Sequence, residues 1–584
     1  MKPTHPLETA VQREGGAELS SGGRGKPSAT AARALPVVRV AIAILLAKRV
    51  VYHLSYLATS PFALATFSDG QLYERAARDI VEHGPLGQQP FYLQGIYAAL
   101  LALPMALGTD VIGGLLLQLL VAGACLWLFH RAAIRAFGAL AGAISTATLL
   151  AFFELSYYEN KYLSVSLGVS LNIAAVYTFV RYLDAPSPRR VLWVGLLAGL
   201  SVLGRPNMLV ALPFTALSLV GYHRHASRPW LPGTVVFALG VAMALAPMAL
   251  RNQLVLGDPH VTPSHGGGIP FYIGNNPHAN GRWNTAGGLL SGQVHEERSE
   301  LLTRLGIEAA GKSRAQLDRE VGDKLFAQGR TWILDNPGTW LRLSTKKLWM
   351  AVGNHAYVRD YDMAGERQSL GAAHHLGLPF SIVLGLGTLG LGVLVRRPAS
   401  TSHGPIRQRT LALMLSGQVL AVLAANALIF TSAQNRVPLA VPLAFVAGPG
   451  LLGLGPFARR LRISALAPSP VVVGVALLLA LQGLWPRTSS SSQPSAAHYF
   501  NLASVEEYLG RDADAAENYA RAVELAPRQP VFRLRHVRAL LRIGRIADAR
   551  RALDVLESQA AAPLEVRRAA AELRTHIPAR RSTP

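Results

Sequence analysis

The sequence predicts an all-α polytopic membrane protein with a mixed loop domain outside the cytoplasm and a small helical domain at the C-terminus. Half of the 584 residues are hydrophobic, only 16% are charged, and the mean hydropathy is +0.27. Soluble domains carry about 25% charged residues, so this deficit indicates a lipid environment. The apolar residues form long runs separated by short basic clusters, which is typical of membrane helices joined by cytoplasmic loops.

The apolar runs set the number of membrane helices. A helix that spans the bilayer needs roughly 20 predominantly apolar residues. Runs of this kind cover residues 37–58, 110–129, 138–156, 162–182, 189–205, 207–222, 231–250, 376–395, 408–430, 436–455 and 468–485. One further stretch, 93–109, is apolar but short, and Pro104 interrupts it.

The basic residues decide the topology. If 93–109 lies along the membrane surface and the N-terminus is cytoplasmic, every inner loop is basic, as the positive-inside rule requires. We therefore expect about eleven spans, with 59–109, 157–161, 251–375 and the C-terminus outside the cytoplasm. The net charge of +23 then belongs to loops, and no nucleic-acid motif accompanies it. The inner loops hold Arg131, Arg135, Arg181, Arg189, Arg190, Arg224, Arg228, Arg396, Arg397, Arg407, Arg409, Arg459, Arg460 and Arg462.

The domain boundaries follow from the same pattern. The N-terminal segment is rich in Gly, Ser, Ala and Glu and is expected to be a disordered cytoplasmic tail. The expected units are the tail 1–34, a transmembrane module 35–250 that includes outer loop 59–109, the large outer loop 251–375, further membrane helices in 376–486, a serine-rich linker 487–496, and a repeat domain 497–578.

The repeat domain is recognised by spacing. Its first copy begins near Tyr499. A second, weaker copy follows 34 residues after the first, with Gly544 matching Gly510 and Ala549 matching Ala515. Arrays of this kind normally need about three repeats, so we expect this one to contact a partner protein or the chain's own large loop, or simply to stabilise the chain. The first copy has the spacing of a tetratricopeptide unit at Tyr499, Leu502, Ala503, Gly510, Ala515, Tyr519, Ala522 and Pro527, and 562–576 fits a capping helix.

The first outer loop holds the leading candidate for chemistry. Asp69 follows the first span, and Tyr73 and Ala77 continue at helical spacing. An acid in this place can be a helix N-cap, worth about 1 kcal/mol, or a catalytic group.

The segments around Asp69 resemble the C-type-fold membrane glycosyltransferases, which include protein O-mannosyltransferases, lipid A aminoarabinose transferases and bacterial relatives with tetratricopeptide tails. The match covers Arg49, Tyr52, Asp69, Tyr73, Ala77, the Pro90–Tyr92 segment and Tyr97, although Gln94–Ala98 lacks both prolines of the family's "PLYP"-like segment. The resemblance implies that Asp69 is the catalytic base and that Tyr73, Tyr92 and Tyr97 line a substrate pocket.

The second outer turn contributes a further acid. Tyr158-Glu159 resembles the family's "YEG"-like segment, and Lys161 lies two residues beyond it. The resemblance implies that Glu159 is a second catalytic acid and that Lys161 belongs to the pocket. The alternative for Glu159 is a solvated carboxylate at a helix end.

Two arginines are candidates for the donor phosphate. Arg205 interrupts the apolar sequence between two spans, and Arg436 lies in a segment that resembles the family's "ARYRLPL"-type sequence. Guanidinium groups bind phosphate bidentately and stay charged. The alternative is an arginine that reaches from the bilayer to its surface.

The large loop begins with the densest match. Residues 266–281 resemble a "GGINFYIGNNPxAxG" stretch of the relatives with tetratricopeptide tails. Asn275 and Asn276 can bond backbone in a turn or the hydroxyls of a sugar, so both are candidates for the substrate pocket.

Together these residues imply a glycosyltransferase in a bacterial inner membrane, with its active site and repeat domain outside the cytoplasm. It would move a sugar from a polyprenyl-phosphate donor to a hydroxyl of an acceptor protein, lipid or glycan, with inversion. No cofactor is identified from the sequence, and Asp69 and Glu159 could share a divalent cation or work without one. The single cysteine, Cys125, excludes an intramolecular disulfide. The interpretation requires Asp69, Arg205 and Arg436 to meet in one pocket.

Two other classes remain as alternatives. A secondary transporter also has many spans, but it would be expected to show internal repeat halves and broken helices at the midplane. A membrane-anchored scaffold would use the repeat domain and would need only one anchoring helix.

Overall fold

The structure is a computed structural model that describes residues 29–261, 263, 266–283, 298–370, 377–396, 404–454, 470–482, 494–559, 562 and 564–576. Several predictions lie outside these residues: the tail up to residue 28, Arg397, Arg459, Arg460, Arg462 and most of the linker 487–496.

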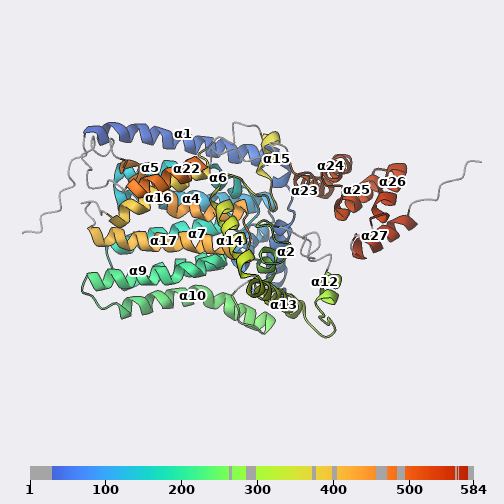
Figure 1. The fold of residues 1–584 in the computed structure, drawn as a ribbon, viewed down its shortest axis with the longest axis horizontal. Coiled ribbons are helices and arrows are strands. Elements are labelled where there is room, and N and C mark those ends of the chain that lie inside the picture. Colours follow the sequence, from blue (N-terminus) through green and yellow to red (C-terminus); the bar gives the residue numbers. More distant parts are fainter. Residues whose placement is uncertain are drawn as a thin grey trace, which may run out of the picture.

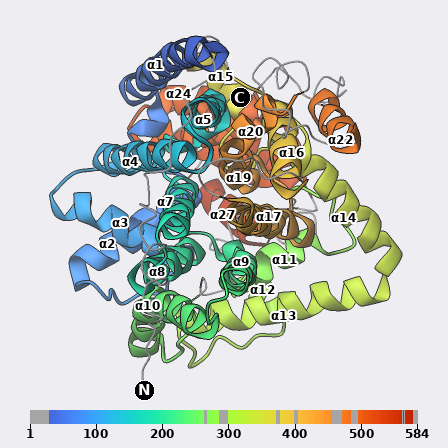
Figure 2. The same ribbon diagram turned by 90° about the vertical axis from the view of Figure 1, so that its left-hand side faces the viewer.

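Long apolar helices lie side by side in one bundle (Figures 1 and 2). Within the bundle, the pairs α8·α10, α7·α8 and α4·α7 pack against each other most extensively. The bundle consists of α1 (Ala29–Thr59), α4 (Val111–Phe137), α5 (Ala139–Ala151), α7 (Val165–Asp184), α8 (Pro188–Gly204), α9 (Ala211–His225), α10 (Leu231–Leu256), α16 (Phe380–Arg396), α17 (Pro405–Leu428) and α22 (Pro470–Leu481).

Among the described helices, four are long and apolar enough to cross a membrane: α4, α7, α10 and α17. A fifth candidate is the pair α5 and α6 (Phe153–Glu159), which is bent by 59° at Phe152. The apolar helices α3 (Gly95–Ala106), α16 and α22 are shorter. A polytopic membrane protein is therefore indicated, and the expected total of about eleven spans stays a prediction.

The apolar run 436–455 does not form the single span that its hydropathy predicts. It is divided into α18 (Ala433–Arg436), the 3₁₀ turn η4 (Val437–Leu439), α19 (Ala440–Phe445) and α20 (Ala447–Leu452). Pro438, Pro442 and Pro449 lie in this run, and proline removes a helical hydrogen bond and clashes with the preceding turn. All residues from 436 to 450 are buried, so this segment forms the centre of the bundle.

The connections at one end of the bundle gather basic residues. Arg135 at the end of α4 pairs with Asp184 at the end of α7 at 3.3 Å, and Arg407 at the start of α17 donates to the carbonyl of Asp184. Figure 1 shows the α9–α10 connection at the same, left-hand end. The elements of the large loop lie at the opposite end of the bundle (Figure 1).

The loops at that opposite end are helical. The described residues of 59–109 and 251–375 contain no strand, so the expectation of a mixed loop domain is wrong for this part of the chain. The loop helices are η1 (Pro61–Ala63), α2 (Asp69–His83), α3, α11 (Gly268–Gly274), α12 (Arg298–Arg304), α13 (Arg314–Asp335), α14 (Pro337–Val352) and α15 (Met363–Leu370), with η2 (Pro206–Val210) between α8 and α9.

The C-terminal helices form a separate array beyond this end (Figure 1). They are α23 (Ala496–Tyr508), α24 (Asp512–Leu525), α25 (Pro530–Arg542), α26 (Ile546–Glu557) and α27 (Leu564–Thr575). Each helix packs on the next. Gly510 and Gly544 join the helices of each pair with φ of +74° and +75°, a conformation that favours glycine.

Candidate functional site: a cavity with one carboxylate and two guanidinium groups

A cavity of about 280 Å³ opens between the bundle and its loop helices. Asp69, Arg205 and Arg359 supply its charged groups, and Trp283 and Phe430 supply aromatic surface. The other lining residues are Leu72, Tyr92, Leu93, Gln94, Pro206, Asn207, Pro263, Gly266, Gly267, Ile269, Pro270, Ala425, Ile429, Asn435 and Pro438. The cavity thus combines apolar walls with few charges, as small-molecule sites commonly do.

Asp69 is the first residue of α2, and its position depends on an unusual backbone. Ser68, the preceding residue, has φ of +50° and ψ of −129°. Positive φ is uncommon for a residue with a side chain, and such strain occurs often at functional sites. The Ser68 hydroxyl donates to Asp360 at 2.7 Å, so the strained turn is fixed to the far loop.

Arg359 is the functional residue that the sequence interpretation missed. Its guanidinium group lies 2.8 Å from the Asp69 carboxylate and 3.6 Å from that of Asp360. It also lies 4.8 Å from the centre of the Trp283 ring, within range of a cation–π interaction. The only sequence signal is a short charged run, Arg359-Asp360-Tyr361-Asp362, within the large outer loop.

The electrostatic environment makes Asp69 a better base than an ordinary aspartate. Burial raises its pKa to about 6, although the charge of Arg359 opposes the rise. The value of about 6 also includes a rise caused by the charge of Asp360 and a lowering caused by the charge of Arg205. A general base works best when its pKa is near the operating pH, so this shift favours proton abstraction near neutral pH.

Arg205 takes its place because the chain breaks between α8 and η2. Gly204 and Pro206 flank it, and its backbone is extended at φ of −147°. Among the residues that the structure describes, its guanidinium group makes one hydrogen bond, a long one of 3.4 Å to the carbonyl of Gln434. Within the described residues, Nε of Arg205 is buried without a hydrogen-bond partner. This guanidinium group is therefore available to an anion in the cavity.

Three predicted pocket residues gather on one side of the cavity. Tyr92 lines it directly. Tyr73 donates to the side chain of Gln94, which also lines the cavity, and its ring lies 4.7 Å from that of Tyr97. Tyr97 in turn donates to Gln118 at 2.7 Å. Tyr73 and Tyr97 therefore support the wall from behind.

Arg436 does not reach the cavity, so the predicted meeting with Asp69 and Arg205 is not found. Nε and Nη2 bind the two carboxylate oxygens of Glu154, with Nε at 3.0 Å. Nη1 donates to the carbonyls of Gly353 and His355. Arg436 is 1% exposed, and a buried charge needs such partners. Four of its five N–H donors bind these interior partners, and the group lies outside the cavity lining, so it connects parts of the bundle instead of facing a phosphate.

Glu159 and Lys161 are likewise committed to the interior. Glu159 pairs with Arg49 of α1, which explains a charged residue inside an apolar helix. Lys161 is fully buried, pairs with Glu366, and lies 4.1 Å and 4.2 Å from the ring centres of Tyr56 and Tyr157. Neither residue lines the cavity, so the predicted roles as acid and pocket residue are not supported.

The arrangement also argues against a cation shared by Asp69 and Glu159. Each carboxylate contacts a different arginine, Arg359 for Asp69 and Arg49 for Glu159. Among the described residues, no group of three or more His, Cys, Asp or Glu side chains is placed to hold a metal ion.

Asn275 and Asn276 shape the backbone and do not line the cavity. The Asn275 amide donates to the carbonyls of Phe271 and Leu428, and the Asn276 amide donates to that of Tyr272. Gly274 has to be a glycine, because a Cβ atom there would lie 1.6 Å from the carbonyl oxygen of Ile429. The motif therefore packs α11 against the end of α17, next to the cavity.

The C-terminal array contacts the segment that carries Arg359. Asn501 of α23 donates to the backbone carbonyl of Asp360 at 2.7 Å. The backbone N–H of Ser495 donates to Asp362 at 2.8 Å, and the ring of His498 lies 6.1 Å from that of Phe62 in η1. The first helix of the array is thus a support of the cavity wall.

No protein-family profile matches this chain, and no curated protein sequence matches it. Among solved structures it is distantly similar to the archaeal oligosaccharyltransferase AglB from Archaeoglobus fulgidus, in complex with an inhibitory peptide and a dolichol-phosphate. The match has 14% identity and a TM-score of 0.37, and it covers 79% of this chain and 56% of that one. ArnT from Cupriavidus metallidurans, bound to undecaprenyl phosphate, matches with 13% identity and a TM-score of 0.32 over 70% of this chain and 79% of that one.

Proposed function

We propose that this protein is a membrane glycosyltransferase that moves a sugar from a polyprenyl-phosphate donor to an acceptor hydroxyl. The observation that carries the proposal is the single cavity shared by a carboxylate, Asp69, and two guanidinium groups, Arg205 and Arg359. A phosphate that leaves with negative charge needs cationic partners, and an attacking hydroxyl needs a base. The cavity provides both.

The proposed step is a single displacement with inversion. The acceptor oxygen attacks the anomeric carbon while the bond from that carbon to the phosphate oxygen breaks. Asp69 takes the hydroxyl proton, and the phosphate leaves with the electron pair of the broken bond. Arg205 and Arg359 stabilise the phosphate, so Arg359 takes the part first expected of Arg436. The ring of Trp283 offers an apolar face beside them.

The remaining features of the proposal concern the membrane and the partners. The chain would cross a bacterial inner membrane about eleven times, with the cavity and the C-terminal array outside the cytoplasm. The array would be a tetratricopeptide-like domain, which supports the cavity wall and offers a surface to a partner protein. The acceptor would be a protein, a lipid or a glycan.

The proposal is tested by deleting the gene in its native host and measuring glycolipids and envelope glycoproteins by mass spectrometry. We expect the loss of one sugar, which the wild-type gene restores and Asp69→Asn does not. Glu82→Gln is the matched control, because Glu82 is an exposed carboxylate on the same helix. Full restoration by a well-expressed Asp69→Asn variant would exclude Asp69 as the base.

A further inference from the structure

The corner between α13 and α14 exposes large apolar side chains. Leu334 is 66% exposed and Leu341 is 62% exposed. Trp332, Ile333 and Trp340 around them are only half-buried. Exposed apolar patches of this kind commonly mark a site that contacts a membrane or another molecule. We name residues 331–341 the elbow tip.

The elbow tip has a local cause in the sequence. Asp335 ends α13, and Pro337 begins α14 after Asn336. Proline is unfavourable after a helical residue but suits the first turn of a new helix. The chain therefore turns sharply, and the corner points away from both helices' buried faces.

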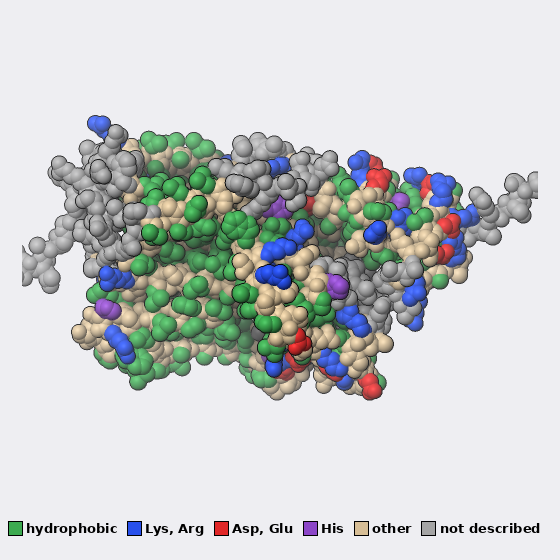
Figure 3. Space-filling view, in the orientation of Figure 1, with side chains coloured by type: hydrophobic (Ala, Val, Ile, Leu, Met, Phe, Trp, Pro, Cys, Tyr) green, Lys and Arg blue, Asp and Glu red, His purple; other side chains and the backbone are tan. Residues whose placement is uncertain are grey.

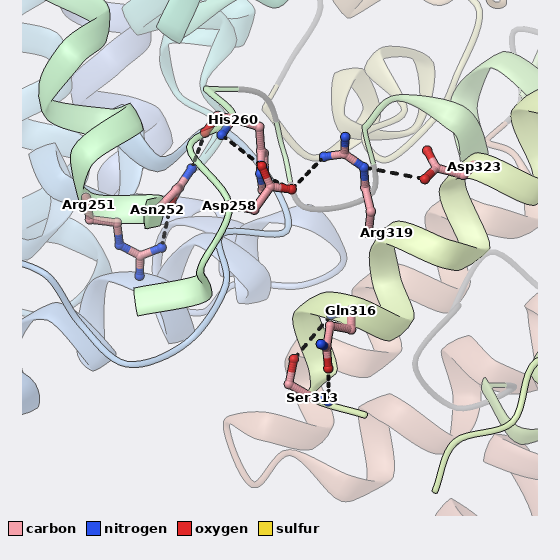
Figure 4. A network of polar contacts seen from close by, with 8 residues as sticks. All are labelled: Arg251, Asn252, Asp258, His260, Ser313, Gln316, Arg319 and Asp323. Carbon is pink, nitrogen blue, oxygen red and sulfur yellow. Dashed lines mark hydrogen bonds and ion pairs between the residues drawn. The ribbon is translucent and has the colours of Figure 1, made fainter. Parts of the chain in front are cut away.

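The two arms of the elbow are anchored firmly. Figure 4 shows how the start of α13 is held: Arg319 pairs with Asp258 at 3.2 Å, and Asn252 of α10 binds the carbonyl of His260 at 2.6 Å. Arg251 continues the network into the carbonyls of Leu86 and Gln89. The arm α14 packs against α17, which is one of the candidate spans. The tip is thus a fixed projection.

The position of the elbow fits a membrane surface. α13 and α14 lie at the cavity end of the bundle in Figure 1, and Figure 2 shows the corner between them projecting sideways beyond the bundle helices. In Figure 3 the apolar surface of the bundle ends at a group of Lys and Arg side chains in the middle of the view. The elbow tip therefore lies at the edge of the apolar surface of the bundle.

The charges beside the tip favour lipid headgroups. Arg330, Arg342 and Lys346 are exposed on the same two helices, and Asp335 is the one acid within the tip. Tryptophan and basic residues are enriched where proteins meet the membrane–water interface, and anionic lipids attract the basic ones. A protein partner would have to complement both these basic side chains and the adjoining apolar surface of the bundle.

We propose that the elbow tip inserts into the bilayer surface at the cavity end of the bundle. Since α13 packs on α11 and α14 on α17, and since Ile269 and Ile429 of these neighbouring segments line the cavity, insertion fixes the cavity at the lipid surface. This inference does not depend on the reaction that the cavity performs.

The test uses the single cysteine. In a Cys125→Ser background, Leu334→Cys is spin-labelled in nanodiscs of phosphatidylethanolamine and phosphatidylglycerol. Collisions with oxygen and with a water-soluble nickel complex are then measured. Two labelled references bracket the result: Leu239→Cys in the middle of α10, and Leu525→Cys in the C-terminal array, which are 55% and 51% exposed in the wild type.

We expect the label at Leu334→Cys to lose access to the nickel complex and gain access to oxygen, as at Leu239→Cys. Nickel access equal to that of Leu525→Cys would overturn the proposal. Shielding from both reagents would also overturn it, because a protein partner would then cover the tip. Leu341→Cys repeats the measurement on the other arm if the first variant folds poorly.

Discussion

The rate of sugar transfer is expected to depend steeply on pH because of the environment of Asp69. Burial raises the pKa of this carboxyl to about 6, and only the carboxylate can accept a proton. At pH 5 about one tenth of the protein would hold the carboxylate, against nearly all of it at pH 7.5. We therefore expect kcat/KM to fall about tenfold between pH 7.5 and pH 5. An aspartate with an ordinary pKa would lose less than about a tenth of its activity over this range.

Arg359 supplies the structural check on this interpretation. Its charge lies 2.8 Å from Asp69 and holds the pKa of that carboxyl down against the effect of burial. Removing the charge in Arg359→Gln should raise the pKa further, so the acid limb of kcat/KM moves to higher pH. Arg78→Gln is the control, because Arg78 is an exposed arginine on α2 that pairs with Glu74.

Binding of the polyprenyl-phosphate donor should shift the pKa of Asp69 in the same direction as the loss of Arg359. A bound phosphate brings negative charge next to Asp69 and competes for the guanidinium groups, and a nearby like charge raises the pKa of a carboxyl. The pH profile of kcat reports the enzyme–substrate complex, and that of kcat/KM reports the free enzyme. The acid limb of the kcat profile should therefore lie at higher pH than that of the kcat/KM profile.

The assay is transfer from a labelled polyprenyl-phosphate sugar by protein in nanodiscs, with folding at each pH checked by gel filtration. A rate that is flat from pH 5 to 7.5 would refute the role of Asp69 as a base with a raised pKa. A limb that stays at the same pH in Arg359→Gln would refute the coupling between the two residues.

Three further outcomes follow from the packing. Arg436→Gln should lower the free energy of unfolding by about 3–5 kcal/mol, because it leaves Glu154 buried without its partner; thermal unfolding in detergent measures this, and adding Glu154→Gln should recover part of the loss. Asn501→Ala should lower kcat/KM about fivefold, since one hydrogen bond of about 1 kcal/mol to the segment of Arg359 is lost. Gly274→Ala should cost about 1–3 kcal/mol of stability by overpacking α11 against Ile429, again measured by thermal unfolding.

Two of these outcomes have a matched control variant. Asn518→Ala removes a hydrogen bond within the C-terminal array, to Glu506, and should leave transfer unchanged. Gly338→Ala adds a methyl group where no atom lies within 4 Å, and should not lower stability. If Arg436→Gln kept its stability and lost only donor affinity, the assignment of Arg436 to the bundle interior would be contradicted.

The sequence alone determined the class of architecture and the approximate positions of its helices. Long apolar runs with few charges can satisfy their backbone in lipid only as helices, and their lengths are set by the bilayer. Breaks at Gly204–Pro206 and the repeated glycines Gly510 and Gly544 were also legible, because proline and glycine constrain the backbone locally. Asp69, Arg205 and Tyr92, three of the candidate residues, line one cavity, and their functional roles stay predictions.

Only the tertiary structure decided which charges line the cavity and which hold the bundle together. A buried guanidinium group must find a carboxylate, and the partner lies far away in sequence: Glu154 for Arg436 and Asp69 for Arg359. The sequence shows Arg436 at a break in an apolar run and Arg359 in a charged run of the large outer loop, and it identifies the partner of neither. The difference arises from which acid the packing brings within hydrogen-bond distance, and that is a property of the assembled helices.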